Sequence, residues 1–242
     1  MIRKLLIGAA VAALLPAAAG AQTFNLSDAY NNTSGRFTLG FGTGTSVTPY
    51  NSTTTSCFGV AGFSCRSFAP VGSTSSNADV YLPAIGYNTT GSPLNVVDAV
   101  TVPGFSLFLH PGDEALNSDS IIRFTSPTAG QYAVSGSFNR LDASGNGNGT
   151  INSIYSDAIG PVSLFSTNAG TRTSSFNLTF NLAAGQSIYF AVNNAGNFQY
   201  DSTGLSGTIA AVPESATWGM MILGFGVMGA AMRRRRTTVA FA

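Results

Sequence analysis

Apolar and polar residues alternate along most of the second half of the chain, which predicts β-strands there. The clearest case is the segment 173–182, where Phe176, Leu178 and Phe180 alternate with Asn or Thr. A period of two gives a strand one apolar and one polar face. The same alternation returns in the segment 187–193 after a short turn. We therefore expect these two segments to pair as a β-hairpin.

Other segments carry the same kind of pattern, separated by turns rich in Gly, Pro, Asn and Asp. A helical period is missing between them, so two packed antiparallel sheets are expected, an all-β antiparallel β-sandwich. Residues 43–55 are dominated by Gly, Ser and Thr and predict a loop. The further segments that predict strands are 36–41, 95–102, 105–109, 120–125, 131–141, 150–156, 162–166 and 204–210.

The first residues of the chain do not alternate. A basic start, Arg3-Lys4, precedes an apolar run over residues 5–15 and the small residues Ala19-Gly20-Ala21. This order is typical of a secretory signal peptide that is cleaved after Ala21, with Ala19 and Ala21 at the recognised positions. Residues 1–21 are therefore predicted to direct export.

The other end of the chain combines an uncharged run with a basic cluster. Residues 216–232 carry no charge, and as a helix they would be ~25 Å long, close to the ~30 Å of a bilayer core. Trp218 stands at one end, and the arginines 233–236 follow the other. Interfacial tryptophan and cytoplasmic arginine are typical of membrane helices. The pattern predicts a C-terminal transmembrane helix over 216–232.

This tail resembles the PEP-CTERM sorting signal in its PEPxxW variant. Pro213, Glu214 and Trp218 carry the match, and Arg233, Arg234, Arg235 and Arg236 complete it. The resemblance implies a sorting signal over 212–236, followed by a short tail over 237–242. It also implies recognition by an exosortase, the membrane protease-transferase that removes the helix and the arginines.

The resemblance further implies passage through the export machinery, a transient stay in the inner membrane, and delivery to the cell surface or extracellular matrix. Ser215 stands where the family usually has a second proline, a departure that concerns the efficiency of processing. An ordinary, permanent C-terminal anchor is the alternative.

The charge balance changes once the two ends are set aside. Between residues 22 and 212 the basic residues are five arginines, against nine acidic residues, so this region is mildly acidic (5 − 9 = −4). It has no basic stripe of the kind that nucleic acid requires, so a nucleic-acid partner is not expected. The arginines are Arg36, Arg66, Arg123, Arg140 and Arg172.

Two cysteines, Cys57 and Cys65, follow the predicted signal peptide and would meet an oxidising compartment. A disulfide between them would stabilise the fold by ~2.6 kcal/mol in the chain-entropy description. Two thiols without a nearby histidine make a metal site unfavourable. A disulfide is therefore expected, and no metal or cofactor is predicted.

A second resemblance covers residues 95–210. The series Leu109-His110-Pro111-Gly112, Ala129-Gly130-Gln131-Tyr132 and the run 182–192 is similar to jelly-roll modules of secreted bacterial proteins, including carbohydrate-binding-like domains. It implies a jelly-roll-like sandwich over 95–211, with a turn-rich β lead-in over 22–94 packing on it. Glycan, such as an exopolysaccharide, is the partner that this resemblance implies.

Catalytic signatures are sparse. The single histidine, His110, has no Gly-x-Ser-x-Gly elbow to accompany it. Asp113 and Glu114 are adjacent, and successive residues of a strand point to opposite faces, which does not suit a glycosidase pair. We therefore expect a protein without enzymatic activity. A secreted hydrolase that acts on polysaccharide or ester through His110 is the alternative.

Sugar recognition needs flat aromatic faces together with amide or hydroxyl groups. The candidate contacts are Tyr155, Tyr189, Tyr200, Asn194 and Asn197.

The segment 142–149 partly mimics a calcium-binding loop, but its twelfth position is Ser153 where a calcium loop has a bidentate glutamate. A flexible hairpin loop is favoured there. Together these observations predict an exported, non-catalytic surface or matrix protein with a glycan-binding or adhesive role.

Overall fold

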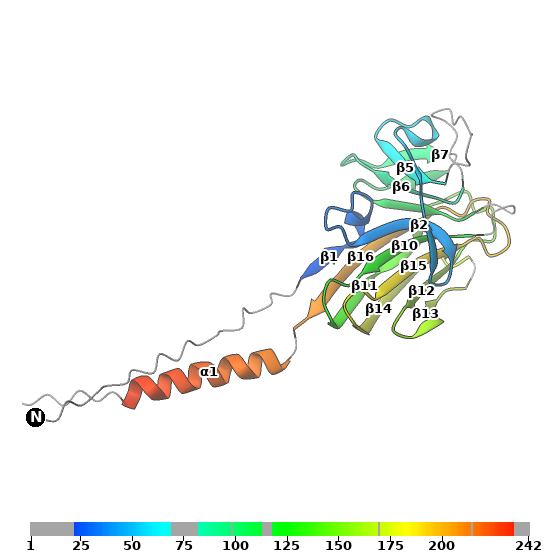
Figure 1. The fold of residues 1–242 in the computed structure, drawn as a ribbon. Coiled ribbons are helices and arrows are strands. Elements are labelled where there is room, and N and C mark those ends of the chain that lie inside the picture. Colours follow the sequence, from blue (N-terminus) through cyan, green and yellow to red (C-terminus); the bar gives the residue numbers. More distant parts are fainter. Residues whose placement is uncertain are drawn as a thin grey trace, which may run out of the picture. The chain divides into compact units, whose positions relative to one another are not determined.

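The computed structural model describes residues 22–68, 82–97, 99–112, 118–168, 170–213 and 215–234. Residues 22–212 form one compact unit, and the rest of the chain belongs to a second. The predicted signal peptide, with Ala19 and Ala21, lies outside the described residues. Within the first unit the regular structure is almost entirely antiparallel strand (Figure 1).

The strands of the first unit make two large sheets. Within each sheet, neighbouring strands pair in antiparallel orientation. The eight-stranded sheet has the order β14 (Thr173–Leu182), β11 (Gly130–Arg140), β16 (Thr203–Val212), β9 (Leu107–His110), β6 (Ala84–Asn88), β5 (Phe63–Ser67) and β4 (Ser52–Thr54), with β1 (Thr23–Asn25) also on β16. The six-stranded sheet has the order β13 (Gly160–Ser166), β12 (Ile151–Ser156), β15 (Ser187–Asn193), β10 (Asp119–Thr125), β2 (Phe37–Thr43) and β3 (Ser46–Pro49).

The connections between the strands give the unit its topology. From β9 to β16 the chain changes sheet at every step except the β12–β13 pair. Four strands of each sheet therefore lie in the orders β14-β11-β16-β9 and β13-β12-β15-β10, the interleaved Greek keys of a jelly roll. The all-β sandwich expected from the sequence is confirmed. The segment predicted as a lead-in supplies strands to both sheets.

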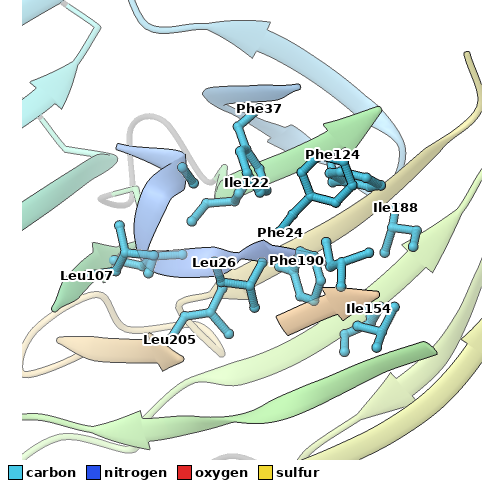
Figure 2. Close-up of a cluster of buried hydrophobic side chains, with 14 of the residues drawn as sticks. Phe24, Leu26, Phe37, Leu107, Ile122, Phe124, Ile154, Ile188, Phe190 and Leu205 are labelled. Carbon is cyan, nitrogen blue, oxygen red and sulfur yellow. The ribbon is translucent and has the colours of Figure 1, made fainter. Parts of the chain in front are cut away.

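The core lies between the two sheets (Figure 2). Ile122, Phe124 and Phe190 come from the six-stranded sheet, and Leu107 and Leu205 come from the eight-stranded sheet. All five are at most 3% exposed. Each such side chain contributes roughly 1.5–3 kcal/mol on burial, so this layer holds the two sheets together.

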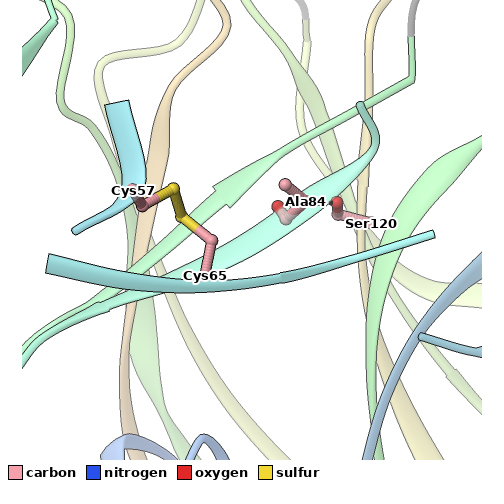
Figure 3. The surroundings of a disulfide bond; sticks show 4 residues. All are labelled: Cys57, Cys65, Ala84 and Ser120. Carbon is pink, nitrogen blue, oxygen red and sulfur yellow. Dashed lines mark hydrogen bonds between the residues drawn. A yellow bond between two sulfur atoms is a disulfide. The ribbon is translucent and has the colours of Figure 1, made fainter. Parts of the chain in front are cut away.

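A buried hydroxyl also joins the sheets. The Ser120 hydroxyl of β10 lies 3.1 Å from the backbone oxygen of Ala84 on β6 (Figure 3) and 2.5 Å from the backbone oxygen of His110 on β9. Ser120 is fully buried, and its single hydroxyl proton is shared between these two acceptors. This side chain therefore links β10 of one sheet to β6 and β9 of the other.

The predicted hairpin between residues 173–182 and 187–193 is wrong. β14 pairs with β11 over ten residues, whereas β15 pairs with β10 and β12 in the other sheet. The ring centroids of Phe176 and Phe190 are 5.9 Å apart because the two strands face each other across the core. Alternation fixes which face of a strand is buried, but it does not fix the strand's hydrogen-bonding partner.

Two shorter segments also differ from the prediction. Residues 43–55, predicted as a loop, contain β3 and β4, and both strands lie at sheet edges where polar side chains remain in water. Residues 95–102, predicted as one strand, form a hairpin of β7 (Leu94–Val97) and β8 (Val100–Val102).

The second unit contains one described helix, α1 (Ser215–Arg234). Among the residues that the structure describes, no helix is long and apolar enough to cross a membrane. The helix predicted over 216–232 is present as an element of this unit. Of the predicted sorting motif, Glu214, Arg235 and Arg236 lie outside the described residues.

Candidate binding cleft

A cleft of about 310 Å³ opens at one end of the eight-stranded sheet. It lies in the size range of small-ligand sites, which begins at ~300 Å³. Its walls come from the β7–β8 hairpin, the end of β9, the segment after β11 and the loop before β16. The lining residues are Phe58, Leu82, Val97, Val100, His110, Asp142, Phe198, Gln199, Tyr200 and Ser202.

Ring contacts connect three lining residues, Phe58, His110 and Phe198, with the buried Phe108 between Phe58 and His110. The rings of Phe58 and Phe108 are 6.0 Å apart, those of Phe108 and His110 are 6.0 Å apart, and those of His110 and Phe198 are 6.5 Å apart. Phe58, Phe198 and Tyr200 are each partly exposed, so they present ring surface to solvent. The cleft therefore offers apolar ring surface of the kind that packs on the C–H faces of a sugar.

Phe58 belongs to the 3-10 turn η2 (Cys57–Gly59), which a second buried cluster fixes on the sheet. Cys57 and Cys65 form a disulfide that joins this turn to β5 (Figure 3). Phe58 has a φ of 55°, a left-handed conformation that is unfavourable for a bulky side chain. The disulfide and the cluster therefore hold a strained aromatic residue at the cleft wall.

Asparagine side chains hold the loop before β16 in its conformation through hydrogen bonds to backbone groups. Asn194 is buried; its Nδ2 donates to the backbone oxygen of Gly112, and its Oδ1 accepts from the backbone of Gly196. The Oδ1 of Asn197 accepts from the backbone of Gln199. Such side chains replace backbone partners in tight turns. They position Gln199 and Tyr200, and Tyr200 has a φ of 65°.

The segment after β11 forms the opposite wall. Asp142 is 2% exposed, and its Oδ1 accepts a 2.7 Å hydrogen bond from the backbone of Ser144. A Cβ at Gly147 would lie 2.7 Å from the backbone oxygen of Gln199, so only glycine permits this approach of the two loops. Asp142 and Tyr200 both line the cleft.

His110 contributes a polar group to the floor of the cleft. Its Nδ1 donates to the backbone oxygen of Pro111 at 3.0 Å, which leaves Nε2 as the acceptor of a neutral ring. Burial lowers the pKa of His110, with the Pro111 bond and the charge of Asp142 opposing this effect. The imidazole is therefore neutral at pH 7.

Asp201 lies between two residues of the cleft wall and is 1% exposed. Neither of its carboxylate oxygens has a hydrogen-bond partner in the described part of the chain. Burial raises the pKa of Asp201 to about 7, with Arg140 lowering it and Asp142 adding to the rise. The carboxyl group is thus far harder to ionise than a solvated aspartate.

The structure brings only one of the sequence-predicted sugar contacts, Tyr200, to the cleft. Tyr155 and Tyr189 are cross-strand partners in the six-stranded sheet, and the Tyr189 hydroxyl donates to Asp157. Asn194 and Asn197 bond within their loop, as described above.

Sequence reasoning missed Phe58, Phe198 and Asp142 as wall residues. The one available signal for Phe198 was an aromatic pair, Phe198 and Tyr200, inside a segment otherwise made of turn residues.

A cation site is not apparent in the residues that the structure describes, which contain no group of three or more His, Cys, Asp or Glu side chains able to hold a metal. In the segment that mimics a calcium loop, Asp142 and Ser144 instead accept bonds from the loop's own backbone.

Comparisons with known proteins give no family for this chain. Neither a family model nor a curated protein matches it. Among solved structures, CBM51 from Clostridium perfringens GH95 in complex with methyl-galactose has a TM-score of 0.37 at 10% identity, covering 78% of this chain and 99% of that chain. The carbohydrate-binding module CBM6cm-2 from Cellvibrio mixtus lichenase 5A, in complex with cellotriose, has a TM-score of 0.24 at 12% identity, covering 73% and 99%.

A third similar structure is an enzyme, the Stig cyclase Fisc from Fischerella sp. TAU, with a TM-score of 0.35 at 12% identity, covering 80% of this chain and 98% of that chain. All three TM-scores lie below 0.5, so these similarities define neither the fold nor a ligand of this chain.

Proposed function

We propose that the protein binds glycan, without catalysis, through the cleft between Phe58, Asp142 and Tyr200. The observation that carries the proposal is the convergence of three partly exposed rings with a carboxylate, an amide and an imidazole in one cleft. The rings supply stacking surface, and the polar groups accept or donate hydrogen bonds to hydroxyls. The same walls contain two residues held in left-handed backbone, which costs free energy that a purely structural loop could avoid.

The test is a glycan array probed with the full chain, followed by titration calorimetry with any retained oligosaccharide. We expect Tyr200→Ala and Phe198→Ala each to weaken binding by about tenfold, since a lost aromatic contact of ~1.4 kcal/mol corresponds to that factor. Tyr155→Ala is the matched control, because Tyr155 lies in the other sheet and does not line the cleft. The proposal would be refuted if the array retained no glycan, or if Tyr155→Ala weakened glycan binding as much as the cleft variants do.

A secreted hydrolase that acts on polysaccharide or ester is the second candidate, because His110 and Asp142 line the same cleft. A neutral imidazole whose Nε2 carries a lone pair has the form of a general base. The hydrolase predicts turnover of a polysaccharide or ester substrate that His110→Ala abolishes, whereas the binding protein predicts retention without turnover.

We also propose that the protein is exported and sorted to the cell surface or extracellular matrix by an exosortase-type system. The support lies in the sequence: residues 1–21 have the order of a signal peptide, and Pro213, Trp218 and the arginines from Arg233 onward resemble a sorting signal. An epitope placed after residue 22 and a second tag at the C-terminus test this. The first tag alone should remain on the mature surface protein, and recovery of both tags on one surface species would contradict processing.

A further inference from the structure

A second, smaller cavity of about 160 Å³ lies away from the cleft. Its walls combine the turn after η1 (Leu26–Ala29), the strand β2, the segment after β3 and one residue of β5. None of its lining residues belongs to the cleft. They are Ala29, Tyr30, Asn32, Phe37, Thr38, Leu39, Pro49, Tyr50 and Arg66.

Two buried hydrogen-bonding groups line this cavity without a well-formed hydrogen bond. The Tyr30 hydroxyl and the Arg66 Nε have no partner of hydrogen-bond geometry among the described residues, although the side chains of Ser64 and Arg66 lie near enough to the Tyr30 hydroxyl to lower its pKa. Tyr30 is only 5% exposed, and the Arg66 guanidinium lies 5.3 Å from the centre of its ring. Because a buried donor without a partner destabilises the fold, two such groups on one cavity indicate a missing acceptor.

Two other polar groups around the cavity make hydrogen bonds. Asn32 accepts from the backbone of Phe37 through Oδ1. The Tyr50 hydroxyl is bonded to the Ser120 hydroxyl. Burial raises the pKa of Tyr30 to about 12 against the opposing charge of Arg66, so its hydroxyl keeps its proton and remains a donor at neutral pH. The cavity thus presents donors and one positive charge.

We propose that this cavity binds a carboxylate group, held by the Arg66 guanidinium and the Tyr30 hydroxyl. Nε and one terminal nitrogen of an arginine match the two oxygens of a planar carboxylate, and its single negative charge balances the single guanidinium. The volume equals about five water molecules at ~30 Å³ each, which suits a carboxylate with the atoms next to it. The carboxylate belongs either to a free organic acid or to a uronic acid unit of a polysaccharide.

The experiment follows the Arg66 Nε–H signal of the ¹⁵N-labelled full chain by NMR. Acetate and glucuronate are added in separate titrations, with glucose as the uncharged control and sulfate as a second anion. We expect acetate and glucuronate to shift this signal saturably and glucose to leave it unchanged. Tighter binding of glucuronate than of acetate assigns the site to a uronic acid, and equal binding assigns it to free organic acids.

Variants connect the signal to the two donors. Arg66→Gln should weaken carboxylate binding by about tenfold or more, because a charge-assisted pair of hydrogen bonds is lost. Tyr30→Phe keeps the ring under the guanidinium and should weaken binding by roughly two- to tenfold. Arg172→Gln, at an exposed arginine, is the matched control and should change nothing.

An Arg66 signal that neither carboxylate shifts would overturn the proposal, as would equal affinity in the Arg66→Gln variant. A response to sulfate as strong as that to carboxylates would also overturn it, since the site would then be a general oxyanion site. Glycan binding at the cleft is measured separately with Tyr200→Ala, so either result stands without the other.

Discussion

Replacing Asp201 by asparagine should change how stability depends on pH. The substitution keeps the shape of the side chain and removes its ionisation. Asp201 is 1% exposed, and both of its oxygens lack hydrogen-bond partners within the described residues. Its pKa in the folded protein is raised to about 7, mainly by burial, whereas in the unfolded chain it returns to ~3.9. The unfolded state therefore ionises this group at a lower pH than the folded state does.

The sign follows from this difference in pKa. Below pH ~4 the carboxyl is neutral in both the folded and the unfolded state, so its ionisation takes nothing from the free energy of unfolding. As the pH rises from ~4 to ~7, the unfolded state releases its proton first, so the free energy of unfolding falls. Above pH ~7 the loss is complete and constant. This pKa difference of ~3 corresponds to roughly 4 kcal/mol, and solvent screening of the carboxyl reduces the expected total loss to the order of 1–3 kcal/mol.

Urea unfolding of the full chain at pH 5 and pH 8, followed by circular dichroism, measures this effect. The Asp201→Asn variant does not titrate at this position. Its free energy of unfolding should therefore exceed that of the wild type by a larger margin at pH 8 than at pH 5, and the two margins should differ by about 1–3 kcal/mol. Asp28→Asn, at an exposed carboxylate, is the control for a general charge effect. Parallel changes in wild type and Asp201→Asn between the two pH values would refute the reasoning.

Three further substitutions test the fold by urea or thermal unfolding. Gly136→Ala should destabilise the fold by roughly 1–3 kcal/mol, because its Cβ would lie 2.1 Å from the backbone oxygen of Ser206. Gly204→Ala is the control: the nearest atom to its Cβ, at 3.1 Å, belongs to the flexible Leu141 side chain, so this variant should lose less stability. Phe190→Ala should cost about 3–5 kcal/mol, because Phe190 is fully buried; a similar loss in Phe105→Ala, at a residue that is 59% exposed, would contradict a core role. Replacing Cys57 and Cys65 together by serine should cost about 2.6 kcal/mol from loop entropy and weaken glycan binding, and unchanged melting with or without reductant would contradict it.

Much of the strand pattern could be predicted because alternation is a local property. The segments predicted at 173–182 and 187–193 coincide with β14 and β15, since their apolar residues repeat every second position. The edge strand β4 was missed because Ser and Thr lie on both of its faces, which leaves no alternation to detect. β3 does alternate, but it has only four residues and ends at Pro49, so its pattern is too short to separate from the loop around it. The pairing of β14 was also missed, because it depends on contacts with β11, more than thirty residues away.

The candidate site was far less predictable than the strands. Phe58, His110, Asp142 and Tyr200 are distant in sequence and meet only through the folding of both sheets. Phe58 and Tyr200 adopt left-handed backbone that no local propensity favours for an aromatic residue. Asn194, read from the sequence as a sugar contact, instead satisfies the backbone of its own loop.

The sequence by itself determined the class of fold, since a period of two in apolar side chains can be buried only by packing one sheet face on another. It also determined the acidic balance of residues 22–212 and the two terminal segments on which export is proposed. Only the tertiary structure decided which strands pair, which aromatic residues reach the cleft, and which buried donors remain without a partner. These features depend on contacts between distant residues, which alternation along a single strand does not encode.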